Sequence, residues 1–252
     1  MEGQNLRYMM RLRWVLLLGA RWCWALSSVR DQFDWSRAMM PTVEAEALTR
    51  PERGEATAVL ASVFGADSRS MAAASAELEN SEGAVRTVRG VLCDAACERL
   101  RAFCDGEMDA QLNFDNTDKL PDFQVNIDFD ERLEALVGAD EFRALRSLPS
   151  VVFGHQRGFE RVGCFVRRYA ADERPFMRFH IDGNAFTANV ALSSSEDHVG
   201  GELVALYDSR CRAVPRRKGA ATVHSGALCH AVSPLTSGVR YSLILFFHAA
   251  QV

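Results

Sequence analysis

The spacing of apolar residues along the chain changes from a helical to a strand-like period. In "GVLCDAACERLRAFCDGEM" apolar residues recur three and four positions apart, which predicts an amphipathic helix with Asp94 as its N-cap and Gly106 at its end. "DERLEALVGADEFRALRSL" predicts a second helical stretch that Gly138 interrupts. Upstream, "ATAVLASVFGA" and "SMAAASAELENSEG" are compatible with marginal helices. Helices are therefore expected before the region with the strand period.

From about Val162 the apolar residues follow the period of β-strands. Turn-forming segments such as "DGN", "SSSEDHVGG" and "SPLTSG" separate these runs. Strands are predicted in "VGCFVRRY", "FMRFHID", "FTANVALS", "GELVALY", "GAATVHS", "ALCHAVS" and "VRYSLILFFH". The pattern predicts an α+β fold with a double-stranded β-helix (jelly-roll, cupin-like) core that N-terminal helices flank.

Composition divides the 252 residues into three expected parts. Residues 1–30 are basic and then apolar, with five arginines against one glutamate. Residues 31–88 form a lead-in rich in Ala, Glu and Ser, which we expect to be partly disordered or helical. Residues 89–252 are expected to form one folded domain.

The N-terminal segment bears on the location of the protein, and the net charge bears on its partners. Arg21 divides the apolar run, so neither half reaches the ~20 residues that span a bilayer, and we expect no stable membrane span. Residues 1–30 fit a signal peptide, a transit peptide, a short signal anchor or a leader without a targeting role. Cytoplasmic, organellar and secretory locations therefore all remain open. The net charge of -4 gives no reason to expect nucleic acid as a partner. The sequence leaves the oligomeric state open.

Seven cysteines lack the spacing of a zinc ribbon or of a dense disulfide framework. Cys93, Cys97 and Cys104 recur at helical spacing, which predicts a buried helix face.

Two polar residues in "MRFHIDGN" share one face of a predicted strand. His180 and Asp182 are two positions apart, so their side chains project to the same side. Alone, this pair is more typical of a turn cap than of a metal site. With a second histidine it would make the two-histidine, one-carboxylate set of non-haem Fe(II) oxygenases. The histidines available as third ligand are His155, His198, His224, His230 and His248, of which His224 and His230 lie on predicted strands.

The last predicted strand places a basic residue and a hydroxyl on one face. Arg240 and Ser242 are again two positions apart, and a guanidinium can bind a carboxylate through two hydrogen bonds. Because an unpaired buried arginine is costly, we expect an acidic ligand or an acidic protein partner for Arg240.

The order HxD, then "GGEL", then "HAVSPLTSGVRYSL" resembles the Fe(II)/2-oxoglutarate dioxygenases, in particular the prolyl 4-hydroxylase-like branch. In that family the distal histidine stands about ten residues before the basic residue that binds the far carboxylate of 2-oxoglutarate. The resemblance therefore implies His180, Asp182 and His230 as iron ligands, with His224 as the alternative to His230. It also implies Arg240 and Ser242 as the carboxylate clamp. The tyrosine that bonds the cosubstrate in the family is matched by Tyr169, and the resemblance covers residues of about 90–250.

The implied activity is hydroxylation of a C–H bond, foremost of a prolyl residue in a peptide or protein, coupled to decarboxylation of 2-oxoglutarate to succinate and CO2. Fe(II), 2-oxoglutarate and O2 are the implied cofactors and cosubstrates, and ascorbate is a family expectation. Thr187 and Asn189 lie on the strand after the HxD motif, and the resemblance leaves open which of them also contacts the cosubstrate.

Two alternative functions remain. The chain could be a hydroxylase of another side chain or of a small molecule, or it could be a catalytically silent cupin-like binding module. Asp182 argues against halogenation, because halogenating relatives have a small residue at that position. Phe246 stands where nucleic-acid demethylases of the superfamily carry a second arginine, so nucleic acid is not an expected substrate. The basic run "SRCRAVPRRKG" is interpreted as a solvated hairpin, with an acidic peptide contact as a minor alternative.

Overall fold

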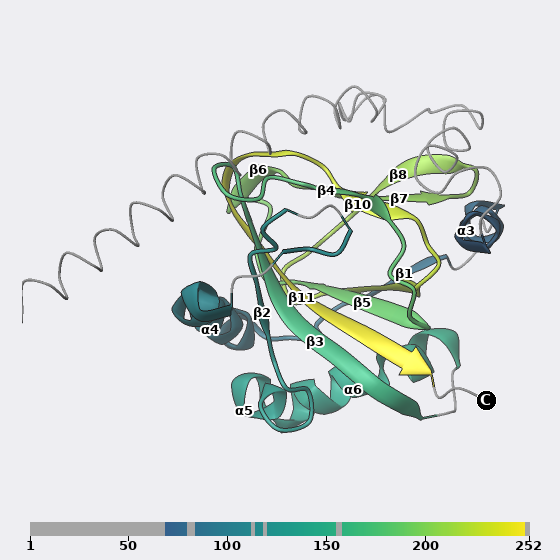
Figure 1. Ribbon diagram of the computed structural model, residues 1–252. Helices are drawn as coiled ribbons and strands as arrows, with labels where there is room; N and C mark the ends of the chain where they lie inside the picture. The colour runs from purple at the N-terminus through teal and green to yellow at the C-terminus, as the bar shows by residue number, and fades with distance from the viewer. Residues whose placement is uncertain (1–68, 80–83, 112–113, 118–119, 155–157, 250–252) are drawn as a thin grey trace, which may run out of the picture.

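Two antiparallel β-sheets face each other, and helices cover the outer side of the larger sheet (Figure 1). The computed structural model describes residues 69–79, 84–111, 114–117, 120–154 and 158–249. The N-terminal segment 1–30, most of the lead-in and the segment "ATAVLASVFGA" lie outside these residues. The helices are α3 (Arg69–Glu79), α4 (Asp94–Gln111), α5 (Leu133–Val137) and α6 (Ala139–Phe153).

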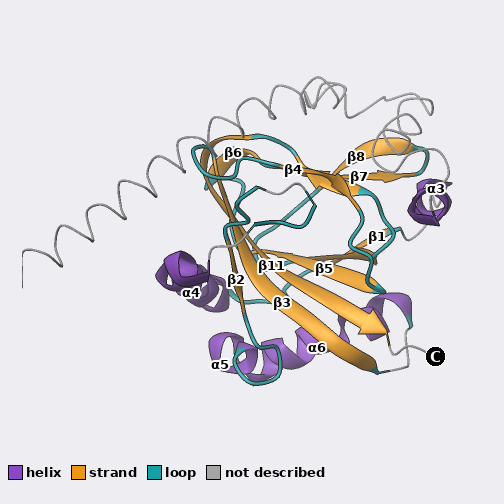
Figure 2. Ribbon diagram, viewed as in Figure 1, coloured by secondary structure: helices purple, strands orange, loops and turns teal. Residues whose placement is uncertain are grey.

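The larger sheet has the strand order β1-β9-β5-β11-β3-β2, with β6 also paired to β11. Its strands are β1 (Val85–Val88), β9 (Ala221–Ser225), β5 (Phe186–Ala191), β11 (Leu235–Ala249), β3 (Phe159–Ala170), β2 (Gln124–Asn126) and β6 (His198–Gly200). The smaller sheet has the order β4-β10-β7-β8. Its strands are β4 (Met177–His180), β10 (His230–Val232), β7 (Leu203–Tyr207) and β8 (Arg210–Val214). Figure 2 shows this sandwich of strands with α4, α5 and α6 outside the larger sheet.

Strand alternation divides β11 between a core face and an inner face. Leu243, Leu245 and Phe247 pack with the buried residues of α4, α5 and α6 in the main hydrophobic core. The residues between them, Ile244 and Phe246, line a cavity that faces the smaller sheet. The outer face therefore stabilises the fold by burying apolar surface, and the side chains of the inner face line the cavity, where they can contact a ligand.

The expected α+β double-stranded β-helix is confirmed, with all seven predicted strands present. The expected break between the two parts of the second helical stretch is also present, because Gly138 has a φ of 104° between α5 and α6. In α4, Cys97 and Cys104 are fully buried in the main core, whereas Cys93 precedes the helix and is exposed. The six cysteines within the described residues are free.

Three local expectations were wrong. Gly106 does not end α4, which continues to Gln111, since a glycine within a well-packed amphipathic helix only lowers its stability. The segment "SSSEDHVGG", expected as a turn, contains β6, a short strand that pairs with the longer β11. Cys93, expected on the buried helix face, precedes α4 and is exposed. The basic run forms a hairpin as expected, because β8 pairs antiparallel with β7.

None of the helices in the described part of the chain is both long and apolar enough to cross a membrane.

Candidate metal and cosubstrate site

The three proposed metal ligands meet at one end of the smaller sheet. His180 ends β4, Asp182 follows it, and His230 begins β10 directly opposite His180 in the strand register. One nitrogen or oxygen atom from each of the three side chains lies within 4.8 Å of the others. The chain turns after β4 because the backbone N–H groups of Asp182 and Gly183 both donate to Gly226 O, at 2.9 and 3.3 Å.

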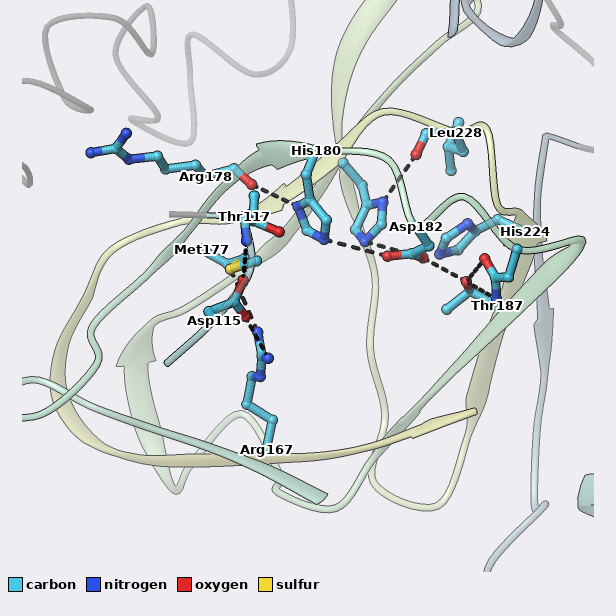
Figure 3. A network of polar contacts seen from close by, with 12 residues as sticks. Asp115, Thr117, Arg167, Met177, Arg178, His180, Asp182, Thr187, His224 and Leu228 are labelled. Atoms are coloured by element: carbon cyan, nitrogen blue, oxygen red, sulfur yellow. Dashed lines mark hydrogen bonds and ion pairs between the residues drawn. The ribbon is translucent and has the colours of Figure 1, made fainter. Parts of the chain in front are cut away.

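Backbone carbonyls fix the orientation of both histidine rings. His180 Nδ1 lies 2.7 Å from Arg178 O, and His230 Nδ1 lies 3.0 Å from Leu228 O. A carbonyl only accepts, so each Nδ1 carries a proton, and in the neutral form of each ring the lone pair is on Nε2. His180 Nε2 lies 3.4 Å from Asp182 Oδ1 (Figure 3). His230 Nε2 lies 3.8 Å from Asp182 Oδ2. Such a donor set fits a divalent metal with open coordination positions.

Burial and mutual charge set the protonation of the ligands. Burial alone would raise the pKa of Asp182, but the neighbouring His230 and His180 outweigh it and hold this pKa well below its usual range. Burial lowers the pKa of His230 to about 3 although Asp182 opposes the shift. A charged carboxylate beside a neutral imidazole is the state that a metal ion requires of its ligands.

A hydroxyl on β5 holds the carboxylate in place. Thr187 Oγ1 donates to Asp182 Oδ2 at 2.5 Å, and Asn184 Nδ2 lies 3.1 Å from the same hydroxyl. Thr187, one of the two residues considered for the cosubstrate, thus contacts a proposed ligand. Hydrogen bonds of this kind orient a ligand and raise its affinity for metal.

The remaining histidines lie outside the three-residue set. The His224 ring is 4.7 Å from that of His230, and its buried Nε2 has no hydrogen-bond partner among the described residues. His198 begins β6 with its Nδ1 2.9 Å from Gly200 O, and His248 lies near Arg161 on the larger sheet. His155 is outside the residues that the structure describes.

A cavity of about 320 Å³ opens from the ligand set between the sheets. Its walls include Tyr169 and Arg167 on β3, Asn189 on β5 and Leu203 on β7. Arg167 is neutralised there, because its Nη2 lies 2.7 Å from Asp115 Oδ2.

Arg240 lies on the inner face of β11 with 1% of its surface exposed. Its Cζ stands 4.8 Å from the centroid of the Tyr169 ring. In the described part of the chain, none of its three guanidinium nitrogens has a hydrogen-bond partner. Burial lowers the pKa of Arg240 to about 10, so it remains charged at neutral pH. A buried cation of this kind fits an anionic ligand such as a carboxylate.

Arg216 reaches the same region and was missed from the sequence. It follows β8 in the basic run interpreted as a solvated hairpin, yet its Nη2 donates to Ser242 Oγ and to Asn189 Oδ1, both at 2.9 Å. Asn189, the other residue considered for the cosubstrate, thus contacts Arg216. β8 ends at Val214, directly before Pro215, and no periodic pattern in the sequence places the side chain of Arg216.

Sequence comparison finds relatives for about a third of the chain. No protein-family model matches. Over 86 residues, which are 32% of this chain, it is 44% identical to a multifunctional procollagen lysine hydroxylase and glycosyltransferase of Rattus norvegicus. Over the same length it is 42% identical to procollagen-lysine,2-oxoglutarate 5-dioxygenase 1 of Mus musculus. The matches span 11% and 12% of the length of these two relatives.

Structural comparison covers most of the chain. A prolyl-4-hydroxylase from Pseudomonas putida superposes with a TM-score of 0.54 at 22% identity, over 71% of this chain and 99% of that one. This similarity establishes the fold, and together with the sequence matches it confirms the resemblance expected from the motifs.

Proposed function

We propose that this chain, which is related to the 2-oxoglutarate-dependent dioxygenases by both fold and sequence, hydroxylates a C–H bond of a peptide or protein side chain. The observation that carries the proposal is the orientation of the ligand set. Both histidines donate from Nδ1 to a backbone carbonyl and turn Nε2 toward one buried carboxylate. A turn cap, the simpler interpretation of His180 and Asp182, would not need a second histidine held in the same way.

In this proposal His180, Asp182 and His230 hold Fe(II). The metal would supply dioxygen activation, coupled to decarboxylation of 2-oxoglutarate to succinate and CO2. Three ligands leave open positions for the cosubstrate and for O2. Thr187 keeps the carboxylate of Asp182 in its binding orientation.

Arg240, Ser242 and Tyr169 would bind 2-oxoglutarate. Arg240 supplies the buried charge for the far carboxylate, and the Tyr169 ring beneath its guanidinium holds that group in place. Ser242 lies two positions along the same face of β11. An ascorbate requirement stays a family expectation.

A prolyl residue is the proposed substrate, supported by the fold shared with a prolyl-4-hydroxylase. A lysyl residue is the second candidate, because both sequence relatives are named as hydroxylases of procollagen lysine. These relatives are much longer than the matched segment, so their names alone do not identify the substrate of this chain.

The test measures succinate released from 2-oxoglutarate in the presence of Fe(II) and peptide. Two peptides matched in length and flanking residues carry proline or lysine at one position, and mass spectrometry locates any added oxygen. The variants His180→Ala and Arg240→Ala should lose turnover by at least about a hundredfold. Turnover that survives both substitutions would refute the site.

A second measurement decides between the two candidate distal histidines. The His230→Ala protein should lose most of its metal, and the His224→Ala protein should retain it. A wild-type protein that binds neither Fe(II) nor 2-oxoglutarate would instead favour a silent binding module.

A further inference from the structure

Two arginines enter the inner face of the barrel at the same place without an acidic partner. Arg240 comes from β11, and Arg216 from the segment between β8 and β9. Neither forms an ion pair with any carboxylate of the described residues, whereas Arg167 nearby is paired with Asp115. Two guanidinium groups at this site therefore carry uncompensated positive charge.

The contacts of Arg216 place it beside the proposed carboxylate clamp. Its Nη2 lies 2.9 Å from Ser242 Oγ, and Ser242 and Arg240 are same-face neighbours on β11. Its Nε is buried and has no hydrogen-bond partner within the described residues. Part of the guanidinium therefore remains free to donate to a ligand.

The charges of the two arginines oppose each other in the free protein. Burial, and then the charge of Arg240, lower the pKa of Arg216 well below its usual range, and Tyr169 opposes this shift. An anion between the two groups would relieve this repulsion, because charge interactions are strong where water is excluded.

We propose that Arg216 is a second arginine of the cosubstrate site, where it binds the far carboxylate of 2-oxoglutarate together with Arg240. The inference rests on the proposed function. Asn189 would then be a positioning residue, and Ser242 would hold Arg216 in addition to its own contact with the cosubstrate, since both accept hydrogen bonds from the Arg216 guanidinium. Arg216 would determine specificity by favouring 2-oxo acids that end in a carboxylate over those that end in a methyl group.

A purely structural role makes a different prediction. If Arg216 only attached the segment after β8 to the sheet, its loss would lower the stability of the ligand-free protein and leave ligand preference unchanged. The test must therefore compare two ligands that differ only in the far carboxylate.

The experiment uses the full chain loaded with Mn(II) under argon, so that no turnover occurs, and measures Kd by calorimetry. The ligands are 2-oxoglutarate and 2-oxovalerate, which share the chelating end. The variants are Arg216→Gln, Arg216→Lys and the matched control Arg217→Gln. Arg217 is the adjacent, exposed arginine of the same segment. The Tm of each ligand-free variant reports on folding.

We expect Arg216→Gln to weaken 2-oxoglutarate binding by about tenfold or more, the effect of losing a charge-assisted hydrogen bond. Binding of 2-oxovalerate should be unchanged, Arg216→Lys should lie between wild type and Arg216→Gln, and Arg217→Gln should match wild type.

Equal loss for both ligands, or no loss for either, would overturn the role of Arg216 and leave the proposed function in place. A wild-type protein that does not bind 2-oxoglutarate would overturn both. If Arg216→Gln fails to fold, Arg216→Lys provides the test. The proposal is refuted if this variant binds both ligands more weakly but keeps the wild-type preference for 2-oxoglutarate over 2-oxovalerate.

Discussion

A single hydroxyl determines how Asp182 faces the two histidines. Thr187 Oγ1 donates to Asp182 Oδ2 at 2.5 Å, on the side of the carboxylate nearer His230. Replacing Thr187 by Val keeps the shape of the side chain and removes the donor. We expect metal affinity to fall by about tenfold or more, because the carboxylate then loses its fixed orientation.

The measurement for Thr187→Val is a titration with Co(II) followed by absorbance, with Thr187→Ser as the control that retains the hydroxyl. The serine variant should bind metal nearly as well as wild type. Equal loss in both variants would show that packing of the methyl group, rather than the hydrogen bond, is what matters.

Strand alternation places part of the site proposed from the sequence. Arg240 and Ser242 are two positions apart within β11, so their common face follows from the period of a strand. His180 and Asp182 have the same spacing, but β4 ends at His180, and His230 and Tyr169 were implied by the family resemblance alone. Arg216 has no such signal. Its position depends on the return of the chain after β8 and on partners 26 and 27 residues away.

At the scale of elements, the segment between β6 and β7 packs closely against Arg240, a residue of the proposed carboxylate clamp. Gly201 has a φ of 70°, and a Cβ there would lie 3.0 Å from Arg240 Cδ and 2.7 Å from Leu235 Cδ1. Gly201→Ala should therefore displace Arg240. We expect it to lower the free energy of unfolding by about 2 kcal/mol or more and to weaken 2-oxoglutarate binding.

Gly90 provides a matched control for this prediction. It has a φ of 65°, but a Cβ there would meet no atom within 4 Å. Gly90→Ala should lower the stability in urea by about 1 kcal/mol, from backbone strain alone, and leave the Kd of 2-oxoglutarate unchanged. If both variants weaken ligand binding equally, contact with Arg240 is not the cause.

Gly106 in the middle of α4 offers a stabilising substitution. It is exposed, its φ is not positive, and a Cβ would meet nothing within 4 Å. Gly106→Ala should raise the free energy of unfolding by about 0.5–1 kcal/mol, since alanine loses less backbone entropy in a helix. Urea unfolding checks it, and a decrease would mean that the glycine has a role that the helix geometry does not reveal.

The elements missed from the sequence are those that depend on a neighbour. β6 and β2 have three residues each, and β1 has four. Such segments are too short to show the apolar alternation that identifies a strand, and they form by pairing with β11, β3 and β9. Predicting them requires knowledge of the sheet that they join.

At the scale of the molecule, two segments upstream of residue 89 contact the two sheets. β1 pairs with β9 at the edge of the larger sheet, and α3 packs on the smaller sheet through Ala74 and Leu78. Because both segments bury apolar surface against the barrel, we propose that the domain includes them.

The segment between α4 and β2 is tied to the barrel by a buried ion pair, Asp115 with Arg167. Burial raises the pKa of Asp115, but Arg167, the Thr117 N–H and Arg174 outweigh it, so the net shift is downward. A carboxyl whose pKa is lower in the folded state stabilises the protein above its unfolded pKa of about 3.9, and this stability is lost as pH falls through the folded value. Acid should therefore weaken this attachment.

Asp115→Asn tests the pair, because it leaves Arg167 charged and without its carboxylate. We expect the free energy of unfolding to fall by about 3 kcal/mol at pH 7. The difference from wild type should shrink below about pH 4, where Asp115 is protonated in the unfolded chain before it is protonated in the folded protein. Urea unfolding at both pH values measures this, with Glu107→Gln as the control for an exposed ion pair. A penalty that is the same at both pH values would mean that packing, and not charge, attaches this segment. Since Asp115 neutralises the third arginine of the inner face, the variant should also let that arginine compete with Arg240 and Arg216 for the cosubstrate.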